Sequence, residues 1–207
     1  MPLSPATRRK NLHQRRYDFQ GYEREDGQWD IEGRITDVKS YPFDNQFRGT
    51  IEAGEALHDM WIRLTIDINF VVQNIEACID DSPYSVCPSI TPNFQKVIGL
   101  KVGPGWRAAI RRAVGGTEGC THLVEMLGAM ATVTFQTLYP AVIKHQEKLK
   151  ENQESAPPEN KSQEDEGEDK LSKRPGERPG IIDTCHAYSS DGEIVKQEWP
   201  DFYTGRS

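Results

Sequence analysis

The chain has 207 residues, enough for one ordinary domain with tails or for two small domains. Charged residues make up 28% of it and the formal net charge is −7, which excludes the polycationic surface typical of proteins that bind nucleic acid or anionic membranes. The 4 cysteines include no CxxC pair, so a dense disulfide scaffold is excluded and reduced thiols are expected.

Residues 1–16 form a basic N-terminal arm, and no apolar stretch follows them. A secretory signal needs such a stretch directly after its basic residues, so we expect a cytoplasmic protein. Two strands are predicted next, over residues 17–25 and 28–39, because Asp26-Gly27 between them is a strong hairpin turn signal.

Two further strands follow a loop. Apolar residues alternate from Met60 to Ile66, and Val71, Ile75 and Ala77 share one face of the next stretch. A period of two is typical of half-buried strands. The four strands together predict an antiparallel sheet built from N-terminal hairpins.

Helical spacing replaces this alternation after Pro88. The segments "TPNFQKVIGL" and "GPGWRAAIRRAV" predict two short helices, and "HLVEMLGAMATVTFQTLYPAVI" predicts a long one that Pro140 bends or ends. His122, Glu125 and Gln136 make the long helix too polar for a membrane span, so we expect it inside a soluble core. Strands followed by helices predict an α+β core domain over residues 17–145, with the helices packed on one face of the sheet.

The last part of the chain differs in composition. Residues 146–180 are rich in Glu, Lys, Ser, Pro and Gly and contain almost no apolar residue, which predicts a disordered acidic linker. Residues 181–207 regain apolar and aromatic residues. We expect this C-terminal segment to dock on the core and to bring Cys185 and His186 with it.

Cysteine and histidine side chains gather at predicted element boundaries. His58 and Asp59 stand at a strand start, Cys87 precedes a helix, and Cys120 with His122 stands at the entry of the long helix. Cys120 and His122 are two residues apart, so they converge only if Cys120 lies in the glycine loop and His122 in the first helical turn. A thiolate there is stabilised by the helix dipole.

Each of these residues also has a purely structural interpretation. Free cysteine often behaves as a small buried hydrophobe, which is the favoured interpretation of Cys78. His13 in the basic arm and His145 beside the linker are expected to be solvated. The arginines of "GPGWRAAIRRAV" could bind an anionic group, but a solvated helix face is the favoured interpretation.

Two resemblances add to these inferences. The motifs "HDMWIRLTID", "GGTEGCTHLVEML" and "DTCHAYSSDGE" together resemble a proteobacterial family of uncharacterised proteins, over nearly the whole chain except the linker. The layout from His58 to Cys87 is also similar to iron–sulfur scaffold domains of the IscU/NifU type. That second resemblance implies an IscU/NifU-like fold with ligands at His58, Asp59, Cys87 and the Cys120-His122 pair. Histidine replaces the first scaffold cysteine, which suits a single metal ion better than a cluster.

We therefore expect a metal-dependent enzyme of the lyase or hydrolase type that acts on a small organic substrate. Resemblance to the uncharacterised family suggests an aromatic catabolite. The ion would be zinc or iron, and Glu125 and His186 are the candidate catalytic residues for proton transfer. The predicted metal ligands are His58, Asp59, Cys87, Cys120, His122 and Cys185.

Two alternatives stay open. One is a non-enzymatic carrier or assembly module for iron or an iron–sulfur cluster, and the other is metal-free thiol chemistry with Cys120 as nucleophile. We expect no nucleic-acid or membrane partner, and the sequence leaves homo-oligomer formation open.

Overall fold

The computed structural model describes residues 3–154 and 178–205. The chain divides into two compact units, residues 1–144 and residues 145–207.

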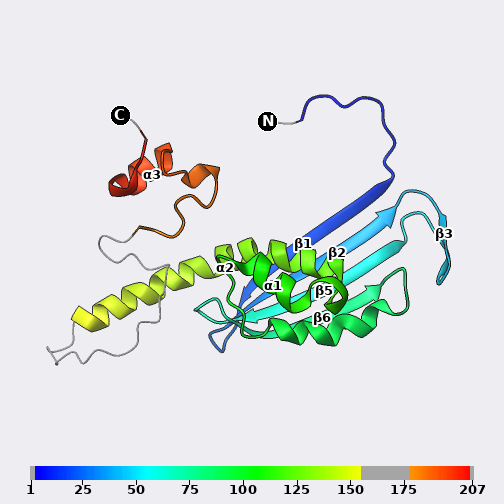
Figure 1. Cartoon of the computed structure of the whole chain (residues 1–207), viewed down its shortest axis with the longest axis horizontal. Helices are drawn as coiled ribbons and strands as arrows, with labels where there is room; N and C mark the ends of the chain where they lie inside the picture. The colour runs from blue at the N-terminus through cyan, green and yellow to red at the C-terminus, as the bar shows by residue number, and fades with distance from the viewer. Residues whose placement is uncertain (1–2, 155–177, 206–207) are drawn as a thin grey trace. The chain divides into compact units, whose positions relative to one another are not determined.

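A four-stranded antiparallel sheet forms the first unit together with helices on one of its faces (Figure 1). The strand order is β1-β2-β5-β6. The strands are β1 (His13–Glu23), β2 (Trp29–Lys39), β5 (Ala56–Ile66) and β6 (Val72–Asp81). The short strands β3 (Phe43–Asn45) and β4 (Gly49–Ile51) form a separate two-stranded sheet. The predicted α+β class with an antiparallel sheet is confirmed.

The hairpin of β1 and β2 is closed by a turn at Gly27. Gly27 has φ +79°, a conformation that glycine adopts without a steric cost, and Glu23 pairs with Trp29 across the turn. The pairing continues along the hairpin to His13 opposite Lys39. β1 therefore starts at His13, so the predicted basic arm of residues 1–16 is too long, and its last residues belong to the sheet.

Helices α1 and α2 lie over one face of the sheet (Figure 1). The helical elements of this unit are η1 (Cys87–Val97), α1 (Trp106–Val114), η2 (Gly116–Glu118) and α2 (Thr121–Glu154). Their apolar faces and the inward residues of the strands form one core, which includes Ile31, Ile62, Ile75, Phe94, Ile110, Leu123, Met126 and Leu127. Trp106 ties the two α-helices together, because its Nε1 donates a hydrogen bond to the carbonyl oxygen of Leu127 at 2.8 Å.

Helix α2 is longer than the sequence predicts. Pro140 lies inside it and does not end it, and the helix continues to Glu154. Residues 146–154 are therefore helical where a linker was predicted, and residues 155–177 of that linker lie outside the described part of the chain. By length and composition alone, α2 could cross a membrane, but the core helix of a soluble protein passes the same test.

The second unit contains a short helix, α3 (Glu193–Glu198), between the 3-10 turns η3 (His186–Tyr188) and η4 (Pro200–Phe202). Ile182 and Val195 are its buried apolar residues. Docking of this segment on the core stays a prediction.

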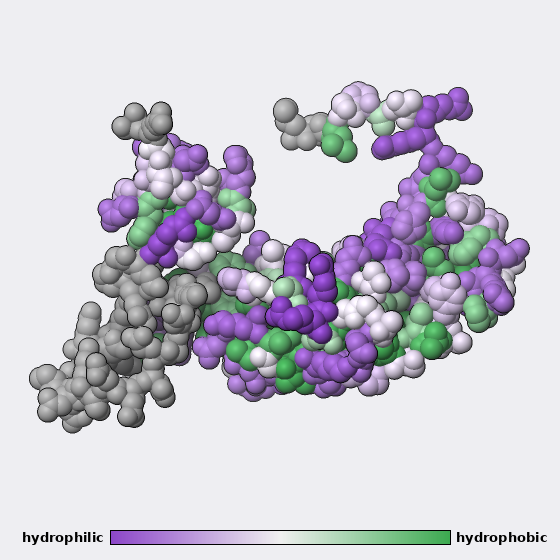
Figure 2. Space-filling model, viewed as in Figure 1, coloured by the Kyte–Doolittle hydropathy of each residue, from purple (hydrophilic) through white to green (hydrophobic). Residues whose placement is uncertain are grey.

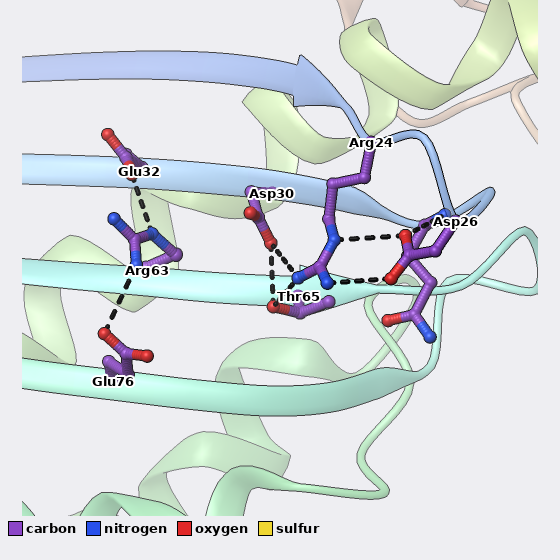
Figure 3. A network of polar contacts seen from close by, with 8 residues as sticks. Arg24, Asp26, Asp30, Glu32, Arg63, Thr65 and Glu76 are labelled. Carbon is purple, nitrogen blue, oxygen red and sulfur yellow. Dashed lines mark hydrogen bonds and ion pairs between the residues drawn. The ribbon is translucent and has the colours of Figure 1, made fainter.

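The outward face of the sheet carries charged side chains that pair across strands (Figure 3). Arg63 Nε donates to Glu32 at 2.7 Å, and Arg63 Nη1 lies 3.3 Å from Glu76. Arg24 binds Asp26 and Asp30 at one end of the same face. Ladders of this kind are typical of a solvated sheet face.

Candidate functional site

A cluster of polar side chains lies on the inward face of the sheet, which is otherwise apolar. Asp37 of β2 is 1% exposed and His58 of β5 is 8% exposed. Alternation along β2 puts Asp37 on the same face as Ile31 and Ile35, and the β2–β5 register places it directly opposite His58. His122, the second residue of α2, completes the cluster from the helical layer.

The three side chains are close enough to share one ion. One ligand atom from each of Asp37, His58 and His122 lies within 4.8 Å of the other two. His58 Nδ1 is 2.9 Å from Asp37 Oδ2, and the His58 and His122 rings have centroids 4.0 Å apart at an interplanar angle of 40°. Within residues 3–154 and 178–205, this is the group of three or more His, Cys, Asp or Glu residues whose ligand atoms all lie within 4.8 Å of one another.

Strand β1 supplies the positive charge beside this group. Arg15 pairs with Asp37 in the β1–β2 register and binds it with both ends of its guanidinium, through Nε at 2.8 Å and Nη2 at 2.7 Å. His13 Nε2 lies 2.9 Å from Asp37 Oδ1. The side chain of His13 is 46% exposed, in agreement with the prediction that it is solvated, and it also reaches the buried carboxylate, because residues two apart on a strand share a face.

The surroundings fix the charge of each group. Burial opposes the ionisation of Asp37, but the hydrogen bonds and the charge of Arg15, aided by His13 and His58, lower its pKa to about 2. Burial lowers the pKa of His58 below 6.5, and the neighbouring His122 lowers it further. Burial and the charge of Arg15 lower the pKa of His122 in the same direction. At neutral pH the cluster therefore presents a carboxylate and two neutral imidazoles, the protonation states that bind a metal.

Cys120 and Glu125 flank the cluster at the start of α2. Cys120 precedes the helix, its carbonyl oxygen accepts the Val124 N–H at 2.9 Å, and its Sγ lies 3.8 Å from His122 Nδ1. Glu125 Oε2 lies 3.2 Å from Arg15 Nη1. Burial, followed by the Glu125 carboxylate, raises the pKa of Tyr17 beside them.

The remaining predicted site residues lie elsewhere. Asp59 points to the outward face, where Arg34 donates to it at 2.8 Å, because neighbours on a strand face opposite sides. Cys87 begins η1 and packs against the apolar core, outside the ligand group defined above. Cys185 and His186 belong to the second unit, so their part in the site stays a prediction.

Asp37 and Arg15 were not predicted as site residues. Asp37 had a readable signal, because Trp29, Ile31 and Ile35 set an odd-numbered inward face that Asp37 continues. A carboxylate at such a position needs partners. Arg15 had no signal of its own, since its place depends on where β1 begins.

Comparison with known proteins places the chain in a family. No curated protein and no solved structure matches it. One family model matches residues 13–136, more than half of the chain. This range begins at the first residue of β1 and includes Asp37, His58 and His122. The chain therefore belongs to the DUF2889 family, proteins of unknown function.

Proposed function

We propose that this protein is a metal-dependent enzyme whose ion is held by Asp37, His58 and His122. The observation that carries the proposal is the approach of the three ligand atoms to within 4.8 Å of one another. Two imidazoles and one carboxylate form a ligand set that is typical of mononuclear zinc and ferrous iron, and it leaves coordination positions open for substrate.

A bound zinc or ferrous ion would polarise a carbonyl or hydroxyl group or activate water, which suits a lyase or a hydrolase. The chain's own residues would orient the site. His13 and Arg15 hold the carboxylate of Asp37 in place, and Glu125 lies at the rim, 56% exposed, as a group that can exchange protons with solvent. We propose a small organic substrate, which includes aromatic compounds. We also propose that the protein is cytoplasmic.

The same contacts imply competition for the carboxylate. Asp37 accepts hydrogen bonds from Arg15 on both oxygens, so an ion can bind it only by displacing part of this contact. Arg15 already has a second anionic partner in Glu125 at 3.2 Å. The Arg15→Gln substitution would therefore remove both a competitor for the carboxylate and a group that positions it.

Metal analysis and titration test the proposal. Purified protein and its His58→Gln and His122→Gln variants are titrated with zinc and, anaerobically, with ferrous iron. Each variant should lose at least about 100-fold in affinity, because loss of a second-shell partner alone costs about 10–100-fold. His145→Gln is the matched control, since His145 is an exposed histidine of the same helix. Wild-type protein that binds no ion, or His122→Gln protein that binds as tightly as wild type, would refute the proposal.

One observation favours thiol chemistry as a second candidate. Cys120 Sγ lies 3.8 Å from His122 Nδ1, directly before a long helix. In that case, Cys120 is the nucleophile and His122 its base. Alkylation with iodoacetamide separates the candidates: faster modification of Cys120 than of the exposed Cys185, together with loss of activity in chelator-treated protein, supports the thiol mechanism. A metal enzyme keeps its activity in the Cys120→Ser variant.

The iron–sulfur carrier suggested by the IscU/NifU resemblance remains an alternative proposal. It requires several thiolates at one centre, and among the described residues of the first unit, Cys120 is the cysteine that borders the cluster. Anaerobic reconstitution with iron and sulfide tests it, because a cluster gives broad visible absorption that a zinc or mononuclear ferrous site lacks.

A further inference from the structure

A cavity of about 430 Å³ lies between α1 and the first turns of α2. Residues that line it include Arg107 and Arg111 of α1 and Cys120, Thr121, Glu125 and Gly128 of the α2 segment. Its volume falls within the range of small-molecule sites, which is about 300–1,000 Å³. In Figure 2, strongly hydrophilic residues gather over the region of α1.

The cavity has an excess of positive charge. Arg107 and Arg111 are one helical turn apart, so both guanidinium groups are carried by the same face of α1. In the part of the chain that the structure describes, neither arginine forms an ion pair with a carboxylate. Glu125 also lines the cavity, but its charge is offset by Arg15 at 3.2 Å.

A glycine of α2 gives Arg107 its position. Gly128 lies in the interior of the helix, where glycine costs roughly 1 kcal/mol relative to alanine. A Cβ atom added there would come within 3.3 Å of Arg107 Nη1. The missing side chain thus lets the guanidinium lie against α2 at the wall of the cavity.

The cavity also adjoins the polar cluster. Cys120 lines it, and the Sγ atom of the same residue is 3.8 Å from His122 Nδ1. Glu125 lines it as well and binds Arg15, which holds Asp37. The three proposed metal ligands are not among the lining residues, so a molecule in the cavity would reach them past Cys120 and Glu125.

We propose that Arg107 and Arg111 bind the anionic group of the substrate, so that the substrate is an organic acid or a phosphate ester. Paired guanidinium groups recognise planar carboxylates and phosphates through charge-assisted hydrogen bonds. Both arginines are exposed, as the interpretation of a solvated helix face expects, and anion binding would be an additional role for them. That the bound anion is a substrate rests on the proposed function. That the two arginines bind an anion does not.

Titration with small anions tests the inference. The ¹⁵N-labelled full chain, with a chelator and at constant ionic strength, is titrated with benzoate and with inorganic phosphate, and benzyl alcohol serves as the neutral analogue of benzoate. The arginine Nε–Hε signals should shift with an anion and not with the alcohol. The Arg107→Gln/Arg111→Gln variant should bind about 10- to 100-fold more weakly, as expected for lost hydrogen bonds to a charged group.

Arg112→Gln is the matched control, because Arg112 is an exposed arginine of the same helix and is not among the residues that line the cavity. Its anion affinity should stay within about twofold of wild type, as expected for a screened surface charge. Tighter binding of benzoate identifies a carboxylate as the group recognised, and tighter binding of phosphate identifies a phosphate. An equal loss of affinity in Arg112→Gln and in the double variant, or failure of both anions to bind, overturns the inference.

Gly128→Ala provides a second test that does not remove the charge. Alanine favours the helix, so the fold is kept, and its Cβ, 3.3 Å from Arg107 Nη1, requires the guanidinium to move by a few tenths of an ångström. Anion affinity should fall by less than in the Arg107→Gln/Arg111→Gln variant while thermal stability is unchanged or higher, and an affinity above that of wild type contradicts the role given to Arg107. The anion titration is carried out without metal, so its result is independent of the metal proposal. The protein could bind an anion and no metal ion, or a metal ion and no anion.

Discussion

Replacing Asp37 by Asn removes the charge that holds four donors together, while the side chain keeps its size. The carboxylate is 1% exposed and accepts hydrogen bonds from Arg15 at 2.7 and 2.8 Å. His13 and His58 are each 2.9 Å from it. Asparagine would leave the Arg15 guanidinium with Glu125, at 3.2 Å, as its remaining anionic partner. We expect this variant to be clearly less stable than wild type at neutral pH.

The size of the loss follows from the pKa of the carboxyl group. The pKa falls from 3.8 to about 2 on folding, which corresponds to about 2 kcal/mol of stability at about 1.4 kcal/mol for each pKa unit. Since the folded-state pKa is the lower one, this contribution is fully present above pH 3.8 and is lost as the pH falls towards 2. Arg15 is 28% exposed, so water offsets part of the penalty for its lost partner.

Urea unfolding of chelator-treated wild type and Asp37→Asn protein between pH 2 and 7 measures the difference. It should be about 2–3 kcal/mol at pH 7 and shrink by about 2 kcal/mol on acidification. Asp59→Asn is the control, because Asp59 also binds an arginine, Arg34 at 2.8 Å, but on the solvated face. It should cost at most about 1 kcal/mol. A difference for Asp37→Asn that is independent of pH would refute the reasoning.

Three further predictions concern the same unit. His58 and His122 should titrate below pH 6.5 in NMR spectra, and their contribution to stability, present above pH 6.5, should be lost as the pH falls through their lowered pKa values. Gly33→Ala should destabilise the fold by about 1–3 kcal/mol in urea unfolding, since the new Cβ would lie 3.0 Å from Phe19 and 3.2 Å from Met126. Trp106→Phe should cost about 1 kcal/mol in the same assay, because the Leu127 carbonyl loses a donor at 2.8 Å.

Local patterns in the sequence were enough to predict most of the first unit. The Asp26-Gly27 turn predicted the first hairpin, and the alternation from Met60 to Ile66 predicted the inward face of β5, which the structure extends to His58. The sequence also predicted that Cys120 precedes the long helix and that His122 lies in its first turn. This prediction needed only the end of the glycine loop and the start of helical spacing. These features depend on a few neighbouring residues.

The rest of the site depends on pairings between distant residues. Asp37, Arg15 and His13 come together through the register of β1 on β2, and that register follows from the whole sheet. The same alternation that turns His58 inward turns Asp59 outward, so the two neighbours could not both be ligands. Helix α2 exceeded its predicted end because Pro140 occupies a helix that is already packed in the core, where tertiary contacts override local propensity.

The position of β1 has a consequence for the dynamics of the molecule. It is an end strand of the four-stranded sheet and carries both Arg15 and His13. Its detachment would break a single ladder and would also strip Asp37 of two of its partners. The rate of native-state hydrogen exchange in β1 would then depend on the charge of Asp37. Neutralising that carboxylate would raise the exchange rate in β1, at the edge of the sheet, before it raises the rate in the central strands.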